Sequence, residues 1–193
     1  MTQWLAAVVA RAIHRFEDPA RFIVGTVGMP GERTFYLQAT EGARVTSVAC
    51  EKEQVVVLAE RLDQLLDEVT RTADVVLSAE SPTDLDPLST PISEEFRVGA
   101  MALGWDATRH RVVVEAHAIV DVDGVDVPDL DEDTAEGPDT LRVRITPEAA
   151  RAFAARARIV VAAGRPPCPF CDLPLDPVGH ICPRANGYRR RTA

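Results

Sequence analysis

Long apolar runs and a surplus of basic residues are both missing from this sequence. The longest apolar run, Trp4 to Ala10, is closed by Arg11, and no basic residue precedes it. A membrane span needs about 20 apolar residues and an export signal needs a basic start, so we expect no membrane anchor. The formal net charge is -9, with 30 acidic against 21 basic residues. A field of that sign repels nucleic acid unless basic groups gather locally.

Cysteines are scarce as well, and no complete catalytic signature is present. Only four cysteines occur, and three of them follow residue 167. A disulfide-stabilised secreted domain would spread its cysteines along the chain, so the clustering predicts a cytoplasmic protein with a metal site. Because no nucleophile, acid and base stand at a recognisable spacing, we expect a protein that is not an enzyme.

Length and composition indicate one globular domain with a small appendage. The chain has 193 residues, of which 46% are hydrophobic and 26% charged. These are ordinary values for a folded domain. We divide the chain into an N-terminal extension over residues 1–11, a domain over residues 12–164 and a C-terminal segment over residues 165–193.

Alternation of apolar and polar residues, interrupted by turn residues, predicts six strands. Met29 to Glu32 (MPGE) suits a type II turn between the first two of them. Each group of three strands is expected to form an antiparallel meander. The strands are predicted over residues 21–28, 34–40, 44–50, 95–105, 111–120 and 140–145.

An amphipathic helix follows each group of strands. Between Glu53 and Val69 the apolar residues recur at helical spacing. The second helix begins with Thr146 as N-cap and Pro147 at its first position, and Gly164 stands where a residue with positive φ ends a helix. This order predicts an α+β fold of two β-β-β-α units with an antiparallel sheet. The similar length of the two units suggests an internal duplication.

A highly acidic stretch separates the last two predicted strands. Residues 121–139 contain nine carboxylates and no basic residue. Like charges at this density repel one another and remain hydrated. We therefore expect a mobile acidic loop here and not a functional acidic site.

The most specific motif is Cys168-Pro-Phe-Cys171, followed after eight residues by His180-Ile-Cys182. Two such pairs, joined by a loop, supply the three thiolates and one imidazole of a tetrahedral Zn²⁺ site. We predict a structural zinc ion bound by Cys168, Cys171, His180 and Cys182. Because one residue between His180 and Cys182 is a tight spacing, Asp176 is an alternative to His180. Redox-active thiols and unliganded cysteines are the remaining interpretations.

Basic charge gathers around this motif. Residues 165–193 carry five arginines against two aspartates, so a basic segment ends an acidic protein. Arginine and tyrosine side chains can hold phosphates and stack on a base; the alternative is that they only keep the segment soluble. The candidate contact residues for a nucleic acid or another partner are Arg184, Asn186, Tyr188, Arg189, Arg190 and Arg191.

Two other candidates carry weaker signals. Glu115 and His117 share one face of a predicted strand, but the simpler interpretation is a histidine whose partners lie inside the fold. Cys50 ends an apolar strand and is expected to be a small buried residue instead of a nucleophile.

Three segments together give a resemblance to a known family. They are the run from Gly25 to Gln38, the segment Glu94-Glu-Phe-Arg-Val-Gly99 and, above all, the C-terminal motif from Cys168 to Tyr188 (CPFC to GHICPRANGY). Over residues 12 to 191 the chain resembles the uncharacterised actinobacterial family catalogued as domain of unknown function 3090. The resemblance implies a cytoplasmic bacterial protein and places Met1 to Ala10 outside the usual start. It implies no activity.

These observations predict a non-enzymatic cytoplasmic binding or adaptor protein that has a structural zinc site and a protein partner. The alternative is a single-stranded nucleic-acid-binding protein that uses the basic segment, since duplicated units of strands and helix also occur in folds that bind single strands. A third interpretation is an enzyme with an unrecognised pocket around Glu115 and His117. That interpretation requires a deep cavity lined by groups of shifted pKa.

Overall fold

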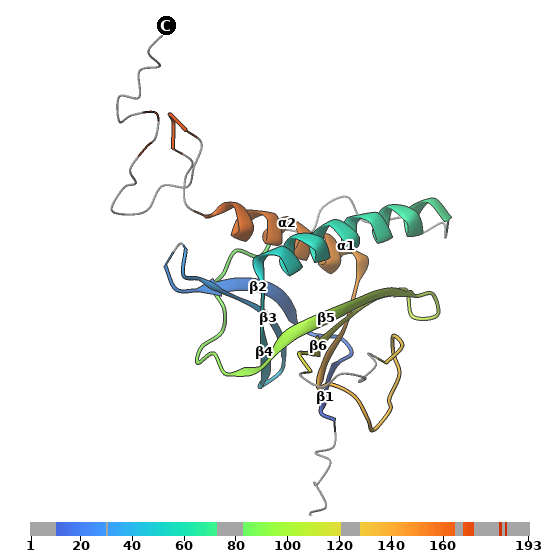
Figure 1. The fold of residues 1–193 in the computed structure, drawn as a ribbon. Coiled ribbons are helices and arrows are strands. Elements are labelled where there is room, and N and C mark those ends of the chain that lie inside the picture. Colours follow the sequence, from blue (N-terminus) through green and yellow to red (C-terminus); the bar gives the residue numbers. More distant parts are fainter. Residues whose placement is uncertain are drawn as a thin grey trace, which may run out of the picture.

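The computed structural model describes residues 11–29, 31–72, 83–120, 128–164, 168–171, 182 and 184. Within these ranges the chain forms seven strands and two helices in an α+β arrangement (Figure 1). In chain order these are β1 (Ile13–Phe16), β2 (Arg21–Val27), β3 (Thr34–Glu41), β4 (Arg44–Cys50), α1 (Lys52–Thr72), β5 (Glu94–Asp106), β6 (Arg111–Ala118), β7 (Thr140–Ile145) and α2 (Pro147–Ala162). Neither helix in these ranges combines the length and the apolar character needed to cross a membrane.

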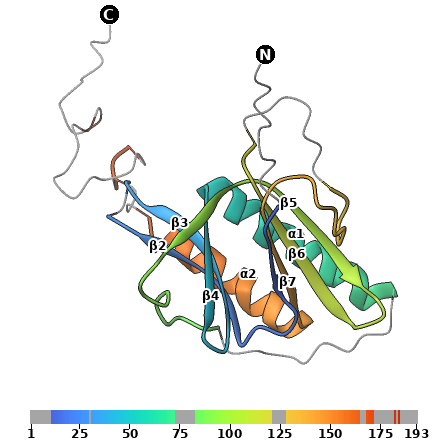
Figure 2. The ribbon, with the colours of Figure 1, turned by 90° about the horizontal axis from the view of Figure 1, so that it is seen from below.

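The described strands join one sheet in the order β1-β7-β6-β5-β4-β3-β2 (Figure 2). The meanders β2-β3-β4 and β5-β6-β7 are antiparallel, as predicted. The expectation of a wholly antiparallel sheet is wrong, because β4 pairs with β5 and β1 pairs with β7 in parallel. Parallel partners are joined by long crossovers, and no turn signal in the sequence marks such a pairing.

β1 is the strand that the sequence pattern does not reveal. It has only four residues, and its register pairs Ile13 with Thr140 and Phe16 with Val143. Four residues are too few for a periodic pattern to stand out. The strand therefore depends on pairing with β7 for its place in the sheet.

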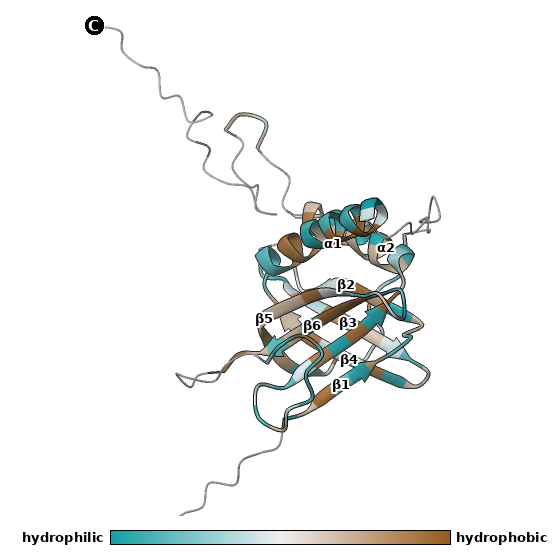
Figure 3. Ribbon diagram, turned by 90° about the vertical axis from the view of Figure 1, so that its right-hand side faces the viewer, coloured by the Kyte–Doolittle hydropathy of each residue, from teal (hydrophilic) through white to brown (hydrophobic). Residues whose placement is uncertain are grey.

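The two helices lie side by side over one face of the sheet (Figure 3). The ring of Phe153 in α2 stacks on that of Phe22 in β2, with 4.8 Å between their centroids. The small residues Ala150, Ala154 and Ala157 are fully buried beside Phe153, and they let α2 approach the sheet closely. The core therefore lies between the helices and the sheet. α1 contributes the apolar stripe that its sequence predicts: Val55, Leu58, Ala59, Leu62, Leu66 and Val69.

The edge of the sheet at β2 is covered by a side chain of α2. Arg156 is buried, and its Nε donates a hydrogen bond of 2.6 Å to the carbonyl oxygen of Val24. Its Nη1 and Nη2 donate to the carbonyl oxygens of Asp84 and Asp86, at 2.5 and 2.7 Å. An edge strand with open carbonyl groups pairs readily with other chains, and the bond to Val24 leaves one carbonyl group of β2 fewer for such pairing.

The sequence prediction for α2 is correct at the start of the helix and wrong at its end. At the start, Oγ1 of Thr146 accepts a hydrogen bond of 3.1 Å from the amide N–H of Ala149, which confirms the N-cap. At the end the prediction is wrong, because Gly164 does not adopt a positive φ and the C-cap is Ala163, with a φ of -68°. The carbonyl oxygen of Ala163 accepts instead from Nη1 of Arg33, at 3.0 Å. A side chain from a distant turn therefore satisfies the end of this helix.

Replacing Thr146 by alanine is expected to lower the free energy of unfolding by about 1 kcal/mol. The substitution removes the acceptor for the Ala149 amide and leaves the rest of the helix unchanged. Chemical denaturation followed by circular dichroism measures the loss. Thr72→Ala is the matched control, because that hydroxyl only donates to the carbonyl oxygen of Glu68 at the end of α1. Equal losses in both variants would contradict the capping role.

Candidate metal centre

Three cysteines of the C-terminal segment converge in space. The sulfur atoms of Cys168, Cys171 and Cys182 all lie within 4.8 Å of one another. Those of Cys168 and Cys182 are 3.8 Å apart, far beyond the length of about 2.05 Å that a disulfide requires. Two sulfurs that bind one Zn²⁺ at about 2.3 Å with tetrahedral angles are themselves about 3.8 Å apart. This cluster, called the thiol cluster below, can hold a metal ion.

The turn at residues 168–171 also favours the ionised form of its first thiol. The amide N–H of Phe170 donates to the sulfur of Cys168 at 3.5 Å. Burial acts to raise the pKa of Cys168, but the amides of Phe170 and Cys171 and the neighbouring thiols together hold that pKa below its ordinary value. The thiolate is the form of cysteine that binds metals.

The remaining predicted ligand and most of the predicted contact residues are not among the residues that the structure describes. His180 and its alternative Asp176 are outside the described residues. Arg184 is described: its side chain is exposed, and its Nη1 donates a hydrogen bond of 3.1 Å to the carbonyl oxygen of Phe170. Arg184 therefore lies beside the cysteine turn. Asn186, Tyr188, Arg189, Arg190 and Arg191 are outside the described residues.

Phe170, which the metal motif does not single out, is the most notable neighbour of the thiol cluster. It lies between Cys168 and Cys171, and its side chain is 61% exposed. A large aromatic side chain is usually buried or in contact with a partner. The sequence does contain a signal for Phe170. It is one of the two inner residues of the Cys-x-x-Cys turn, and these residues do not bind the metal.

Glu115 and His117, the weaker candidates, do meet on the face of the sheet opposite the helices. Both are fully buried, at 0% exposure. Nε2 of His117 lies 3.3 Å from Oε2 of Glu115, although no aligned hydrogen bond joins the two atoms. Nδ1 of His117 is 2.9 Å from the hydroxyl oxygen of Thr140, and Nε of Arg142 donates to Oε1 of Glu115. Strands β6 and β7 together position these four side chains.

The carboxylate of Glu115 is fixed inside the fold. Burial alone would raise the pKa of Glu115, but the neighbouring His117, the amide N–H of Asp131 at 2.9 Å and Arg142 bring that pKa below its ordinary value. A general acid for catalysis near neutral pH needs a raised pKa and access to a substrate. Glu115 has neither, and it does not line the cavities found at α1, α2 and β2. The pair therefore favours a structural role.

The acidic stretch covers this buried group. In residues 128–139, Oδ1 of Asp133 lies 2.6 Å from Nη1 of Arg142, and Oδ1 of Asp131 lies 3.1 Å from the same nitrogen. Residues 128–139 contain no helix or strand, as expected of a loop, but the expectation that all their carboxylates stay hydrated is wrong, because two of them pair with Arg142. Residues 121–127 are outside the described residues. The positive charge that pairs with these carboxylates belongs to Arg142 in strand β7. The sequence of the acidic stretch alone therefore does not predict the pairing.

Cys50 is confirmed as a small buried residue at the end of β4. Burial raises the pKa of its thiol to about 12. The thiol therefore stays protonated at neutral pH, which favours a packing role over that of a nucleophile or metal ligand.

Comparison with known proteins agrees with the resemblance seen in the sequence. The chain matches the family described as protein of unknown function (DUF3090) over residues 14–182. That range includes strands β2 to β7, both helices and the thiol cluster. No curated protein and no solved structure matches the chain. With most of its 193 residues inside the matched range, the chain belongs to the DUF3090 family of proteins of unknown function.

Proposed function

We propose that Cys168, Cys171, His180 and Cys182 bind a structural zinc ion in a non-enzymatic binding or adaptor protein. The observation that carries the proposal is the convergence of three cysteine sulfurs within 4.8 Å. Three thiolates and one imidazole are an established ligand set for structural zinc. The position of His180 two residues before Cys182 supports it as the fourth ligand.

A metal held by four protein ligands acts as a scaffold. No coordination position is left for water or a substrate, so the ion does not catalyse a reaction. The C-terminal segment is short and contains six prolines, so it cannot build a large core of its own, and metal binding supplies the free energy that folds it. The scaffold then presents Phe170 and Arg184 to a partner as a contact surface of one exposed aromatic ring and one cation.

The proposal extends to the origin of the fold and to the location of the protein. The orders β2-β3-β4-α1 and β5-β6-β7-α2 are the same, which supports an internal duplication. The clustered thiols and the family resemblance favour the cytoplasm of an actinobacterium, where cysteines stay reduced and available to metal.

Partner capture with three forms of the full chain tests the adaptor function. The unaltered chain is expected to retain a protein that both Cys168→Ser and Phe170→Ser lose. Cys168→Ser removes the scaffold, whereas Phe170→Ser removes only the exposed ring and keeps all zinc ligands. Arg71→Gln, a surface change at the far end of α1, is the matched control and should retain the partner. A partner that all forms retain equally would contradict the proposal, and calorimetry with the purified partner measures each affinity.

A second candidate function is binding to single-stranded nucleic acid. It is favoured by the exposed ring of Phe170 beside Arg184, because an aromatic ring stacks on bases and a guanidinium holds phosphates. A fluorescent oligonucleotide is then expected to bind with strong salt dependence. The affinity should fall when Arg189, Arg190 and Arg191 become glutamate. Unchanged anisotropy at about 50 mM salt would remove this candidate.

A further inference from the structure

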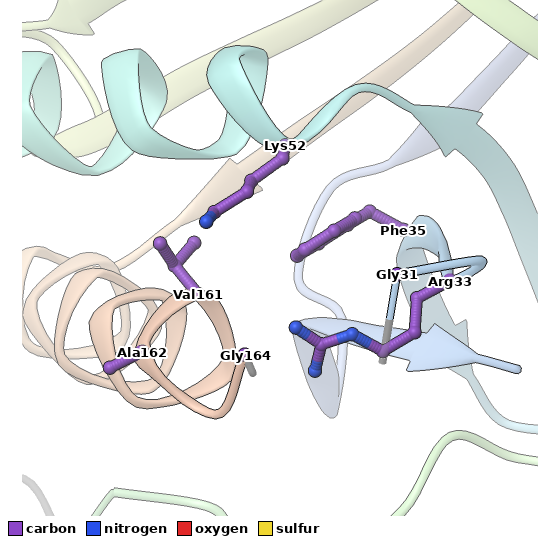
Figure 4. Close-up of a pocket in the computed structure, with 7 residues that line it drawn as sticks. All are labelled: Gly31, Arg33, Phe35, Lys52, Val161, Ala162 and Gly164. Carbon is purple, nitrogen blue, oxygen red and sulfur yellow. The ribbon is translucent and has the colours of Figure 1, made fainter. Parts of the chain in front are cut away.

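An open cavity of about 670 Å³ lies where the start of α1, the end of α2 and the turn before β3 meet (Figure 4). Small-molecule sites commonly have volumes of about 300–1,000 Å³. Figure 4 shows the side chains of Lys52 and Arg33 extending toward the end of α2 from two different elements. The described lining contains no cysteine, so this cavity is distinct from the thiol cluster.

The lining of the cavity is cationic although the protein is acidic. Lys52 and Arg33 are the charged members of the described lining, which contains no carboxylate. Lys52 is also the only lysine among the 21 lysine and arginine residues of the chain. Within the described residues its amine makes no hydrogen bond or ion pair. The carboxylate of the adjacent Glu51 is instead paired with Arg97 at 2.8 Å, so the lysine amine is available to an anion.

Arg33 is held at the rim by two contacts. Its Nη1 donates to the carbonyl oxygen of Ala163 at 3.0 Å, and its Cζ lies 5.6 Å from the centroid of the Phe35 ring. One nitrogen thus closes helix α2, and in the described part of the chain the other N–H groups of Arg33 make no hydrogen bond. A guanidinium that is already fixed loses little freedom when it binds a phosphate or carboxylate.

We propose that this cavity binds a small molecule that carries one phosphate or carboxylate group on a short apolar body. The anionic group lies between Lys52 and Arg33, and the apolar part contacts Val161 and Phe35, which line the same cavity. Lys52 is the first residue of α1, so the positive end of that helix adds to the local potential. Gly31, with a φ of 102°, lets the turn pass the rim without a side chain.

The single lysine makes the test specific. Full-length protein that contains lysine labelled with ¹³C at Cε gives one lysine signal, that of Lys52. Phenyl phosphate is expected to shift this signal saturably, inorganic phosphate with weaker affinity, and phenol not at all. Benzoate in place of phenyl phosphate distinguishes a carboxylate site from a phosphate site. Arg33→Gln should weaken the binding of phenyl phosphate roughly tenfold, whereas Arg71→Gln should leave it unchanged.

Several results would overturn the proposal. They are the absence of a saturable shift with either anion up to about 10 mM, an equal shift with phenol, and an unchanged affinity in Arg33→Gln. Because Arg33 also closes α2, thermal unfolding must first show that this variant is folded. Lys52→Gln removes no hydrogen bond or ion pair of the described fold and is the second variant, followed through the amide signals of Gly31 and Gly164. Binding must weaken in Lys52→Gln as well, and retention of full affinity would refute the site.

Discussion

Replacing Arg142 by methionine is expected to lower the free energy of unfolding by about 3–5 kcal/mol. Arg142 is 2% exposed and pairs with Glu115, Asp131 and Asp133. Methionine keeps much of the apolar stem but leaves the fully buried carboxylate of Glu115 without its cation. This loss is a large share of the free energy of unfolding of a typical domain, which is about 5–15 kcal/mol. Chemical denaturation measures it, and the exposed Arg71→Met should change stability by less than about 0.5 kcal/mol.

A pH series and a second substitution separate charge from packing at this site. The lowered pKa of Glu115 makes its stabilising contribution present above the ordinary glutamate value of about 4.3 and lost as pH falls through the lowered pKa. In Arg142→Met, burial without the cation raises the pKa of Glu115, so the deficit should shrink between about pH 7 and pH 4. Adding Glu115→Gln removes the unpaired charge and should restore part of the stability. A deficit that neither change alters would indicate lost packing instead.

Each purified chain is expected to carry about one zinc ion, and replacing Cys168 or Cys171 by serine is expected to abolish zinc binding. Either change removes one of the three converging thiols. Elemental analysis of protein purified without chelator measures the zinc content. Cys50→Ala, which removes a buried thiol outside the cluster, should leave that content unchanged. Well under half a zinc ion per unaltered chain would contradict the prediction.

Removal of the metal is expected to leave the main thermal transition nearly unchanged. Within the described residues, the buried apolar core runs from Phe16 to Ala157 and includes none of the three cysteines of the thiol cluster. Chelation should therefore affect the C-terminal segment and not the sheet with its helices. A large drop in the main transition would show that the metal segment packs into the core.

The fourth ligand can be identified by two further substitutions. His180→Ala is expected to weaken metal binding strongly, while Asp176→Ala should leave it unchanged, because the proposed site uses an imidazole. Replacement of zinc by cobalt gives absorption bands that report tetrahedral geometry and thiolate ligation. The reverse pattern in the two variants would assign Asp176 as the ligand.

Local elements of this fold can be read from the sequence because local physics determines them. Helix α1 follows from apolar residues at helical spacing, and α2 begins where Thr146 and Pro147 satisfy the requirements of a helix start. The turn before β3 has the predicted hydrogen bond of 2.9 Å from the amide of Glu32 to the carbonyl oxygen of Met29. Each of these features depends on residues within a few positions of one another.

Features that depend on distant residues cannot be read in this way. Gly104 of β5 lies under the side chain of Leu130, and a Cβ at Gly104 would collide with it. Nothing in the sequence around either residue indicates that the two are in contact. Together they allow the acidic stretch to lie on the sheet. The same limit applies to the ion pairs of Arg142. For the thiol cluster, in contrast, the spacing of the cysteines was sufficient to predict that three of them converge.

The pairing of β1 with β7 has a consequence for synthesis of the chain. Ile13 pairs with Thr140 and Phe16 with Val143, so β1 has no partner until nearly all of the domain has been translated. At about 5–20 residues per second, the ribosome needs roughly 6–25 s to make the intervening chain. β1 spends this interval as an unpaired strand, but its four residues offer a poor template for association. The first antiparallel unit, complete at Thr72, can begin to fold while the rest is still being made.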